Sequence, residues 1–253
     1  MHVLVTFAVD AEFAPWRKLR HLREIKIGDL RLNQAQIGRA MVDFVVTGMG
    51  AENASRTANA VMTQPYAICI AAGFAGALQP DYPVGTVVVA EAVQKLGDSK
   101  TLTGSRNLAH AARDDGAKMI RLLTSDHVVR TVEEKALLAP LAGAVDMESF
   151  AILAAAVAHN RPAVAIRVIS DANDGEIPPF VNAMVDEKGK IIASNVFRQM
   201  ARHPLQLPAL IRLGRDSKAA AESLAHFLEA FVKKLSLSSH GWPPAELQEL
   251  ASR

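Results

Sequence analysis

The chain has 253 residues, of which 50% are hydrophobic and 21% are charged, an ordinary composition for a globular protein with a substantial core. Its formal net charge of +2 gives no reason to expect a nucleic-acid partner. We expect neither a signal peptide nor a transmembrane segment, because the N-terminus has no basic region and no apolar run reaches about 18 residues. The single cysteine, Cys69, lies in an apolar run, which favours a small core residue in a reducing, cytoplasmic setting.

Short apolar runs alternate with helical patterns along the first two thirds of the chain. Nearly continuous apolar runs, typical of strands that are buried on both faces, occur at Val3–Val9, Met41–Thr47, Ala67–Ala72, Thr86–Val93, Met119–Thr124 and Ala163–Ile169. Helices are predicted at Ala51–Met62, Glu133–Leu141 and Met147–Asn160. Asp146 is a plausible N-cap of the last of these. The alternation, with mainly parallel pairing, predicts a three-layer α/β fold.

The pattern changes after the Ile177-Pro-Pro179 break. Gly189 marks a turn, and further helices are predicted at Ile191–Arg202, Leu207–Leu213 and Ser217–Leu235. Residues 236–253, which contain Ser-Ser-His-Gly-Trp-Pro-Pro, are expected to form a loosely held tail. We therefore predict one domain over residues 1–235, followed by this tail.

Three acidic residues fall where a predicted strand gives way to a loop or helix, which is where open α/β sheets bind ligands. Glu12 follows the first strand, Glu148 follows the apolar run Ala142–Val145, and Asp171 ends the strand Ala163–Ile169. Taken singly, each residue fits an ordinary helix-end acid or turn residue as well as a catalytic one. The residues alone leave both interpretations open.

Two glycine-rich turns, Thr47-Gly-Met-Gly-Ala51 and Ala72-Gly-Phe-Ala-Gly-Ala77, each follow an apolar strand and allow backbone amides to approach a ligand. The first matches half of a dinucleotide fingerprint, but Asn53 stands where the third glycine is needed. A dinucleotide-dependent oxidoreductase is therefore disfavoured. No His/Cys/Asp cluster has the spacing of metal ligands, so we expect no metal and no cofactor.

Taken in order, these segments resemble the nucleoside phosphorylase/nucleosidase superfamily. The matching pieces are Ala8-Val-Asp-Ala-Glu12, Val46-Thr-Gly-Met-Gly50, Ala72-Gly-Phe-Ala-Gly-Ala-Leu78, Thr124-Ser-Asp126, Ala144-Val-Asp-Met-Glu-Ser149 and Arg167-Val-Ile-Ser-Asp171. The last two are the specific part. The resemblance implies an α/β/α sandwich around a mixed, mainly parallel sheet. It also implies an enzyme that cleaves the N-glycosidic bond of a purine nucleoside.

Within the superfamily, the first and last motifs resemble methylthioadenosine/S-adenosylhomocysteine nucleosidases. The short middle region, Ile177-Pro-Pro179 and the stretch Arg202–Asp216 are more similar to the hopanoid-associated branch, which is described as an adenosylhopane nucleosidase or phosphorylase. An adenosylhopane substrate requires a large apolar channel at the 5′ side of the sugar. The shortened region Gln94–Lys118 would remove a lid there. Ile191–Leu213 could flank the opening or contact a membrane surface peripherally, although an ordinary packed helix pair fits the same pattern.

The resemblance assigns a role to each acidic residue. Asp171 would protonate the purine N7 as general acid, oriented by Ser170. Glu148 would accept hydrogen bonds from the ribose hydroxyls while Met147 packs against the sugar, and Glu12 would deprotonate the attacking water. The other expected substrate-binding residues border the base and are Phe74, Ala75, Gly76 and Val128. A homo-oligomer is also implied, because sites of this superfamily often borrow residues from a neighbouring subunit.

The nucleophile is left open at this point. Phosphorylases of the superfamily tend to offer an arginine and a serine in the second glycine turn, whereas Ala71–Ala75 contains neither, which favours water and hydrolysis. Phosphorolysis is the alternative, with phosphate as co-substrate held by the amides of Gly48 and Gly50, by Arg17 or Arg39, or by a neighbouring subunit. A non-catalytic nucleoside-binding protein is a third hypothesis, but it predicts the loss of a key carboxylate, and all three are present.

Overall fold

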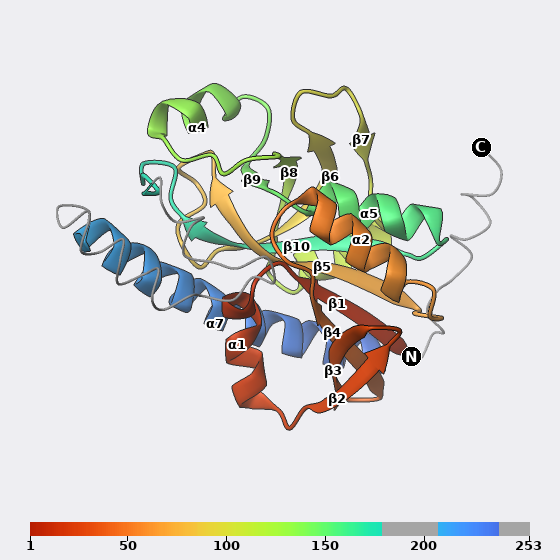
Figure 1. Ribbon diagram of the computed structural model, residues 1–253. Helices are drawn as coiled ribbons and strands as arrows, with labels where there is room; N and C mark the ends of the chain where they lie inside the picture. Colours follow the sequence, from red (N-terminus) through yellow and green to blue (C-terminus); the bar gives the residue numbers. More distant parts are fainter. Residues whose placement is uncertain (179–206, 238–253) are drawn as a thin grey trace.

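The computed structural model describes residues 1–178 and 207–237 (Figure 1). The strands are β1 His2–Phe7, β2 Arg23–Ile27, β3 Leu30–Ile37, β4 Ala40–Val46, β5 Ile68–Ala77, β6 Val87–Lys95, β7 Thr101–Leu102, β8 Lys118–Thr124, β9 Ala144–Asp146 and β10 Ala163–Asp171. The helices are α1 Asp10–Leu19, α2 Ala51–Val61, α3 Arg106–Asp114, α4 Val132–Leu138, α5 Ser149–Ala158 and α7 Leu207–Leu237. All six predicted strands are therefore confirmed.

The sheet is mixed, as expected, and runs in the order β10-β6-β8-β9-β5-β1-β4-β3-β2. Parallel pairs join β4, β1, β5 and β10, and also β6, β8 and β9. Antiparallel pairs join β6 to β10 and β9 to β5, and add the β2–β3 hairpin and β7. Because β10 also pairs with β5, the part of the sheet from β5 to β10 closes on itself.

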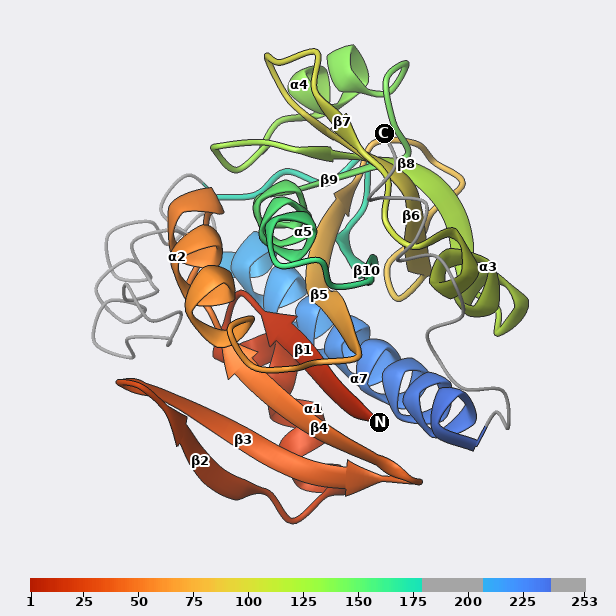
Figure 2. The same cartoon turned by 90° about the vertical axis from the view of Figure 1, so that its right-hand side faces the viewer.

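Helices cover both faces of the sheet, which confirms the three-layer α/β arrangement (Figure 2). Buried side chains of α1, α3 and α7 pack in one hydrophobic cluster, whereas those of α2 and α5 pack in a second cluster on the opposite face. Cys69 is buried in the second cluster, as predicted, and burial raises the pKa of its thiol to about 12.

The boundaries differ from the sequence predictions in several places. The helix α1, the helix α3 and the β2–β3 hairpin were not predicted. The separate helices expected at Leu207–Leu213 and Ser217–Leu235 are wrong, because α7 is continuous across Gly214. The helix α5 begins at Ser149, with Glu148 rather than Asp146 at its N-cap position. The buried face of α7 begins at Ala220, after the exposed Gly214, and packs in the same cluster as α1 and α3.

An aromatic cluster fixes the start of α1 relative to the sheet. The Phe13 ring stacks on those of Phe7 and Phe44, and Trp16 lies edge-on to both of these strand residues. The Trp16 Nε1 donates to Glu229 of α7 at 2.8 Å. The first turn of α1, which carries Glu12, is thereby held against the end of β1.

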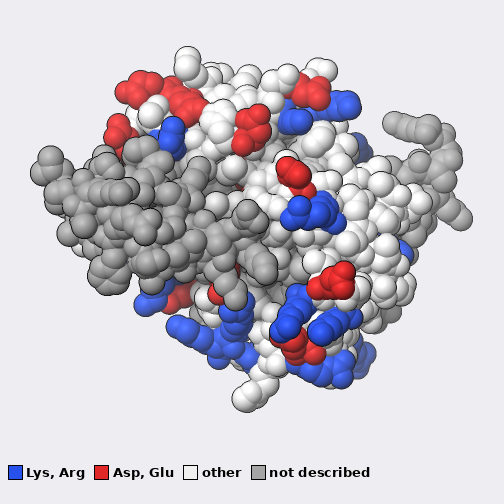
Figure 3. Space-filling model, viewed as in Figure 1, with Lys and Arg blue, Asp and Glu red and all other residues white. Residues whose placement is uncertain are grey.

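Several predictions fall outside the described residues: the turn at Gly189, the helix at Ile191–Arg202 and the tail from residue 238 onward. The single-domain boundary at 235 therefore stays a prediction. Across residues 1–178 and 207–237, no helix is both long and apolar enough to cross a membrane. Figure 3 shows basic and acidic side chains interspersed on the face displayed, in keeping with the small net charge.

Candidate active site

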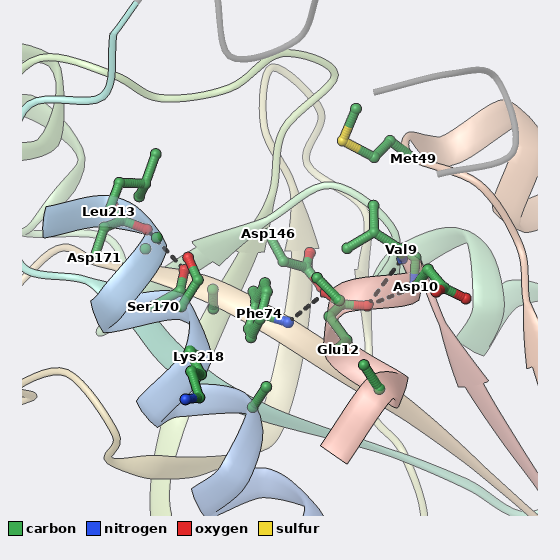
Figure 4. A pocket seen from close by; sticks show the side chains of 18 of the residues that line it. Val9, Asp10, Glu12, Met49, Phe74, Asp146, Ser170, Asp171, Leu213 and Lys218 are labelled. Carbon is green, nitrogen blue, oxygen red and sulfur yellow. Dashed lines mark hydrogen bonds between the residues drawn. The ribbon is translucent and has the colours of Figure 1, made fainter. Parts of the chain in front are cut away.

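A cavity of about 1320 Å³ opens at the carboxyl ends of β1, β5, β9 and β10. All three predicted carboxylates, Glu12, Glu148 and Asp171, line it. So do the other predicted substrate-binding residues, which are Phe74, Ala75, Gly76, Val128, Met147 and Ser170. Figure 4 shows Phe74 between Glu12 on one side and Ser170 and Asp171 on the other. The structure thus brings together residues that lie far apart in the sequence.

Glu12 is buried at the junction of β1 and α1 and is not a solvated first-turn acid. Its Oε2 accepts hydrogen bonds from the amides of Ala8 and Val9 at 2.7 and 3.1 Å. Its Oε1 accepts a hydrogen bond from the Phe74 amide at 2.7 Å. Burial raises the pKa of Glu12, while the charge of Arg167 and the three amides oppose that rise. The carboxylate is therefore fixed in orientation and is a stronger base than a solvated glutamate.

Glu148 lies between β9 and α5, at the N-cap position of α5, but its side chain makes no capping hydrogen bond to that helix. Its Oε1 accepts the Gly50 amide at 2.8 Å, and its Oε2 lies 3.7 Å from Arg167 Nη1. Burial raises the pKa of Glu148 to about 7, and the charges of Asp146 and Glu12 act in the same direction, against Arg167. This carboxyl group therefore titrates close to neutral pH.

Arg167 connects the carboxylates on this side of the cavity. It is 1% exposed in the middle of β10, with Nη2 at 2.7 Å from Asp146 Oδ2 and Nη1 directed to Glu148. Its Nε donates to Ser149 Oγ at 3.0 Å, and Nη1 donates to the Ala72 carbonyl at 3.3 Å. The sequence analysis quoted this arginine within a motif but assigned it no role. The available signal was a lone cation inside an otherwise apolar strand.

Asp146 adds a third buried acid, which the sequence analysis read only as a helix cap. Its Oδ1 accepts a hydrogen bond from Thr124 Oγ1 at 2.7 Å, and its Oδ2 accepts the Ser149 amide at 3.0 Å besides contacting Arg167. The carboxylate thus supports the start of α5 and also holds the guanidinium. We call Glu12, Asp146, Glu148 and Arg167 the arginine half of the site.

Asp171 stands at the end of β10 in different surroundings. Its Oδ1 accepts a hydrogen bond from Ser170 Oγ at 3.0 Å, in agreement with the predicted orienting role of that serine. Its Oδ2 lies 2.6 Å from the Nζ of Lys135, a residue of α4 that the sequence analysis did not single out. We call Ser170, Asp171 and Lys135 the lysine half of the site.

Two glycines of β5 make room for these groups. At Gly73, where φ is +149°, a Cβ atom would contact Arg167 and come within 2.7 Å of Glu12 Oε1. At Gly76 a Cβ atom would lie 2.9 Å from Asp171 Oδ2. The glycine turn predicted at Ala72–Ala77 is therefore wrong: these residues form the second half of β5, and their two glycines give space to side chains on both sides of the site.

The candidate anion-binding residues lie less favourably. Gly48 and Gly50 do not line the cavity, although Met49 between them does, and the Gly50 amide is already bonded to Glu148. Arg17 lines the cavity, but it pairs with Asp10 and its guanidinium lies over the Phe13 ring at 4.7 Å. Arg39 is absent from the cavity lining as the described residues define it.

The cavity continues away from the carboxylates along α1 and α7. From α1 it is lined by Ala11, Ala14, Pro15, Arg17, Lys18 and Leu19. From α7 it is lined by Leu210, Ile211, Leu213, Gly214, Ser217, Lys218, Ala221, Glu222, Ala225 and His226. Most of these side chains are small or apolar, and we call the part of the cavity that both helices line the α1–α7 channel.

Comparison with known proteins places the chain in a family. The sequence model of the phosphorylase superfamily matches residues 4–202 of this chain. The chain therefore belongs to this superfamily. The expectation of an enzyme that cleaves N-glycosidic bonds is thereby confirmed. Futalosine hydrolase of Streptomyces coelicolor is 31% identical over 182 residues, which cover 59% of this chain and 77% of that protein.

Solved structures show the same fold. The native futalosine hydrolase of Helicobacter pylori strain 26695 aligns with a TM-score of 0.72 at 16% identity, over 92% of this chain and 98% of its own. The 5′-methylthioadenosine/S-adenosylhomocysteine nucleosidase of Neisseria meningitidis, in complex with methylthio-immucillin-A, aligns with a TM-score of 0.70 at 20% identity. That alignment covers 92% of this chain and 99% of the other. The predicted fold class is thus confirmed.

Proposed function

We propose that this chain is a purine nucleosidase that releases adenine from a 5′-substituted adenosine by hydrolysis. The observation that carries the proposal is the meeting of Glu12, Glu148 and Asp171 around one cavity, with Arg167 between the first two. The names of the relatives, a futalosine hydrolase and nucleosidases, support cleavage by water.

Departure of the base needs a proton, because an adenine anion is a poor leaving group. In our proposal Asp171 gives its proton to N7 while the C1′–N9 bond breaks and its electron pair goes to the base. Phe74, Ala75, Gly76 and Val128 border the base. A positioned general acid typically contributes about 100- to 10,000-fold to the rate. Asp171→Asn is therefore expected to lose most of the turnover.

The sugar becomes cationic as the base leaves. Glu148 lies where a carboxylate can accept hydrogen bonds from the ribose hydroxyls and stabilise the developing charge, and Met147 packs beside it. Glu12 deprotonates the attacking water, which fits a buried carboxylate whose pKa is raised by burial. Water attacks C1′ as its proton passes to Glu12, so the products are adenine and a free sugar.

Hydrolysis is favoured over phosphorolysis by the contacts of the candidate anion site. The Gly50 amide already donates to Glu148, Arg17 is paired with Asp10, and the stretch Ala71–Ala75 of β5 contributes no cation. A phosphate dianion next to Glu12 and Glu148 would also meet two buried carboxyl groups. These contacts make water the simpler nucleophile.

The α1–α7 channel supports a bulky apolar 5′ substituent, of which the triterpenoid of adenosylhopane is the example that we propose. A cavity of about 1320 Å³ exceeds the range of roughly 300–1,000 Å³ that ordinary small-molecule sites occupy. Small side chains of α1 and α7, among them Ala14, Gly214 and Ala221, form its walls. An elongated apolar group would bury its surface there without displacing large side chains.

The substrate proposal is tested by comparing adenosine, methylthioadenosine and a long-chain 5′-alkyl adenosine, with free adenine as the readout. We expect the alkyl compound to have the highest kcat/KM, and a preference against it would overturn the assignment of the channel. In Gly214→Phe the new side chain begins in open space, since no atom lies within 4 Å of a Cβ atom there. It should raise KM for the alkyl compound alone. Gly214→Ala, the matched control, should leave KM unchanged for all three compounds.

A further inference from the structure

Lys135 is the buried cation that the proposed mechanism does not use. It lies on α4, where Glu133, Ala136 and Leu137 are exposed, yet Lys135 itself has no exposed surface. An ammonium group is costly to remove from water unless each of its N–H groups finds an acceptor. Its burial on a short surface helix therefore calls for a specific reason.

Three acceptors surround the Lys135 ammonium group. Its Nζ donates to Asp171 Oδ2 at 2.6 Å, to the Ala172 carbonyl at 2.7 Å and to the Gly175 carbonyl at 3.0 Å. These contacts use all three N–H groups. The lysine thus binds the end of β10 and the segment that follows it, and it does so at the residue that we assign as the general acid.

Glu134, the residue before Lys135 on α4, is paired elsewhere. Glu134 accepts hydrogen bonds from His127 Nε2 at 2.7 Å and from the Arg130 amide at 3.1 Å. In the described part of the chain, Asp171 is the one carboxylate within ion-pair distance of Lys135. The pair is therefore one to one, whereas Arg167 is shared among several acids.

Asp171 lines the cavity and Lys135 does not, so the lysine can act on a substrate only through the aspartate. The Lys135 ammonium group holds Oδ2 of Asp171, which occupies the space next to Gly76. Ser170 holds Oδ1. A backbone hydrogen bond from the Ile177 amide to the Arg130 carbonyl, at 3.1 Å, also joins the segment after β10 to the segment before α4. Asp171 is consequently held by contacts from two directions.

We propose that Lys135 is a positioning residue for base departure, an inference that rests on the proposed nucleosidase function. It holds the Asp171 carboxyl group in the orientation that faces the base. It also stabilises the carboxylate that remains after the proton has passed from Asp171 to the base nitrogen, since an ammonium group next to a newly formed negative charge lowers its energy. Both effects act on the proton transfer rather than on substrate binding, because Lys135 does not line the cavity, so we expect them in kcat more than in KM.

The test is a double-mutant cycle of Lys135→Met and Asp171→Asn, with adenine release as the readout. In the wild-type background we expect Lys135→Met to lower kcat about 10- to 100-fold, the scale that a small misplacement of a catalytic group causes. KM should stay within about threefold. In the Asp171→Asn background the same substitution should change kcat less than about threefold, because a residue that acts through Asp171 has nothing left to position.

Leu137→Ala, at a residue of the same helix that is 79% exposed, is the control and should leave kcat unchanged. Circular dichroism and thermal melting check the folding of each variant. If Lys135→Met does not fold, Lys135→Gln carries the same cycle, since it removes the charge but keeps a donor.

Two results would overturn the inference while leaving the proposed function intact. One is a Lys135→Met enzyme with wild-type kcat, and the other is an equal loss of kcat in both backgrounds, which indicates a merely structural role. A wild-type chain that releases no base from any nucleoside would overturn the function and the inference together.

Discussion

The two halves of the site neutralise their acids in different ways. In the arginine half, Glu12, Asp146 and Glu148 share the single cation Arg167, whereas in the lysine half Asp171 has Lys135 to itself. Three buried acids around one cation cannot all ionise at low cost, and burial accordingly raises the pKa of Glu12 and that of Glu148. The arginine half can therefore take up a proton near neutral pH, while the lysine half holds one carboxyl group in place.

Removal of Arg167 is expected to have the largest effect on stability, because it leaves three buried acids without their shared cation rather than one. Arg167→Met should lower the free energy of unfolding by about 3–5 kcal/mol at pH 7, the cost of leaving a buried charge without its partner. Urea denaturation measures the loss, and Arg167→Lys, which keeps the charge, should recover part of it. A wild-type unfolding midpoint for Arg167→Met would contradict the central place of this cation.

Alanine substitutions at the two glycines of β5 add a methyl group to each half of the site, so their costs in stability can be compared. Gly73→Ala should cost about 3 kcal/mol or more, since its φ of +149° is unfavourable for alanine and the methyl group would contact both Arg167 and Glu12. Gly76→Ala should cost about 1–3 kcal/mol and lower kcat by displacing Asp171. Thermal unfolding and adenine release separate the two effects. Equal melting temperatures for the two variants would contradict the tighter packing assigned to the arginine half.

The pH dependence of stability tests the raised pKa of Glu148, whose largest cause is burial. The pKa of Glu148 is raised from 4.5 to about 7, so the folded state binds the proton more tightly than the unfolded state. The stabilisation from this proton is complete below about pH 4.5 and is lost as the pH rises through about 7. Between those limits the wild type should lose about 3 kcal/mol relative to Glu148→Gln. Parallel stability curves for the two proteins would contradict the raised pKa.

The smallest expected effect belongs to Ser170. Ser170→Ala removes one hydrogen bond to Asp171 while Lys135 continues to hold the other oxygen, so kcat/KM should fall only about fivefold, near 1 kcal/mol. Steady-state kinetics measure this change. A loss as large as that of Asp171→Asn would show that the serine, and not the lysine, holds the acid.

The carboxylates were predictable from the sequence because they stand at strand ends within recognisable motifs. Arg167 and Lys135 were not, because what marks them is burial next to partners from distant segments. Lys135 in particular reads as an ordinary charge on a short helix until the segment after β10 covers it. The strand β2, with Arg23, Glu24 and Lys26, escaped prediction because it lies at the sheet edge and lacks an apolar run.

In the proposed reaction, water that is activated by Glu12 attacks the sugar. The most direct measurement is adenine release from a 5′-substituted adenosine in phosphate-free buffer and in added phosphate, with the sugar product examined by phosphorus NMR. For hydrolysis we expect equal rates in both buffers and no phosphorylated sugar. A rate that depends on phosphate, with sugar 1-phosphate as the product, would contradict it.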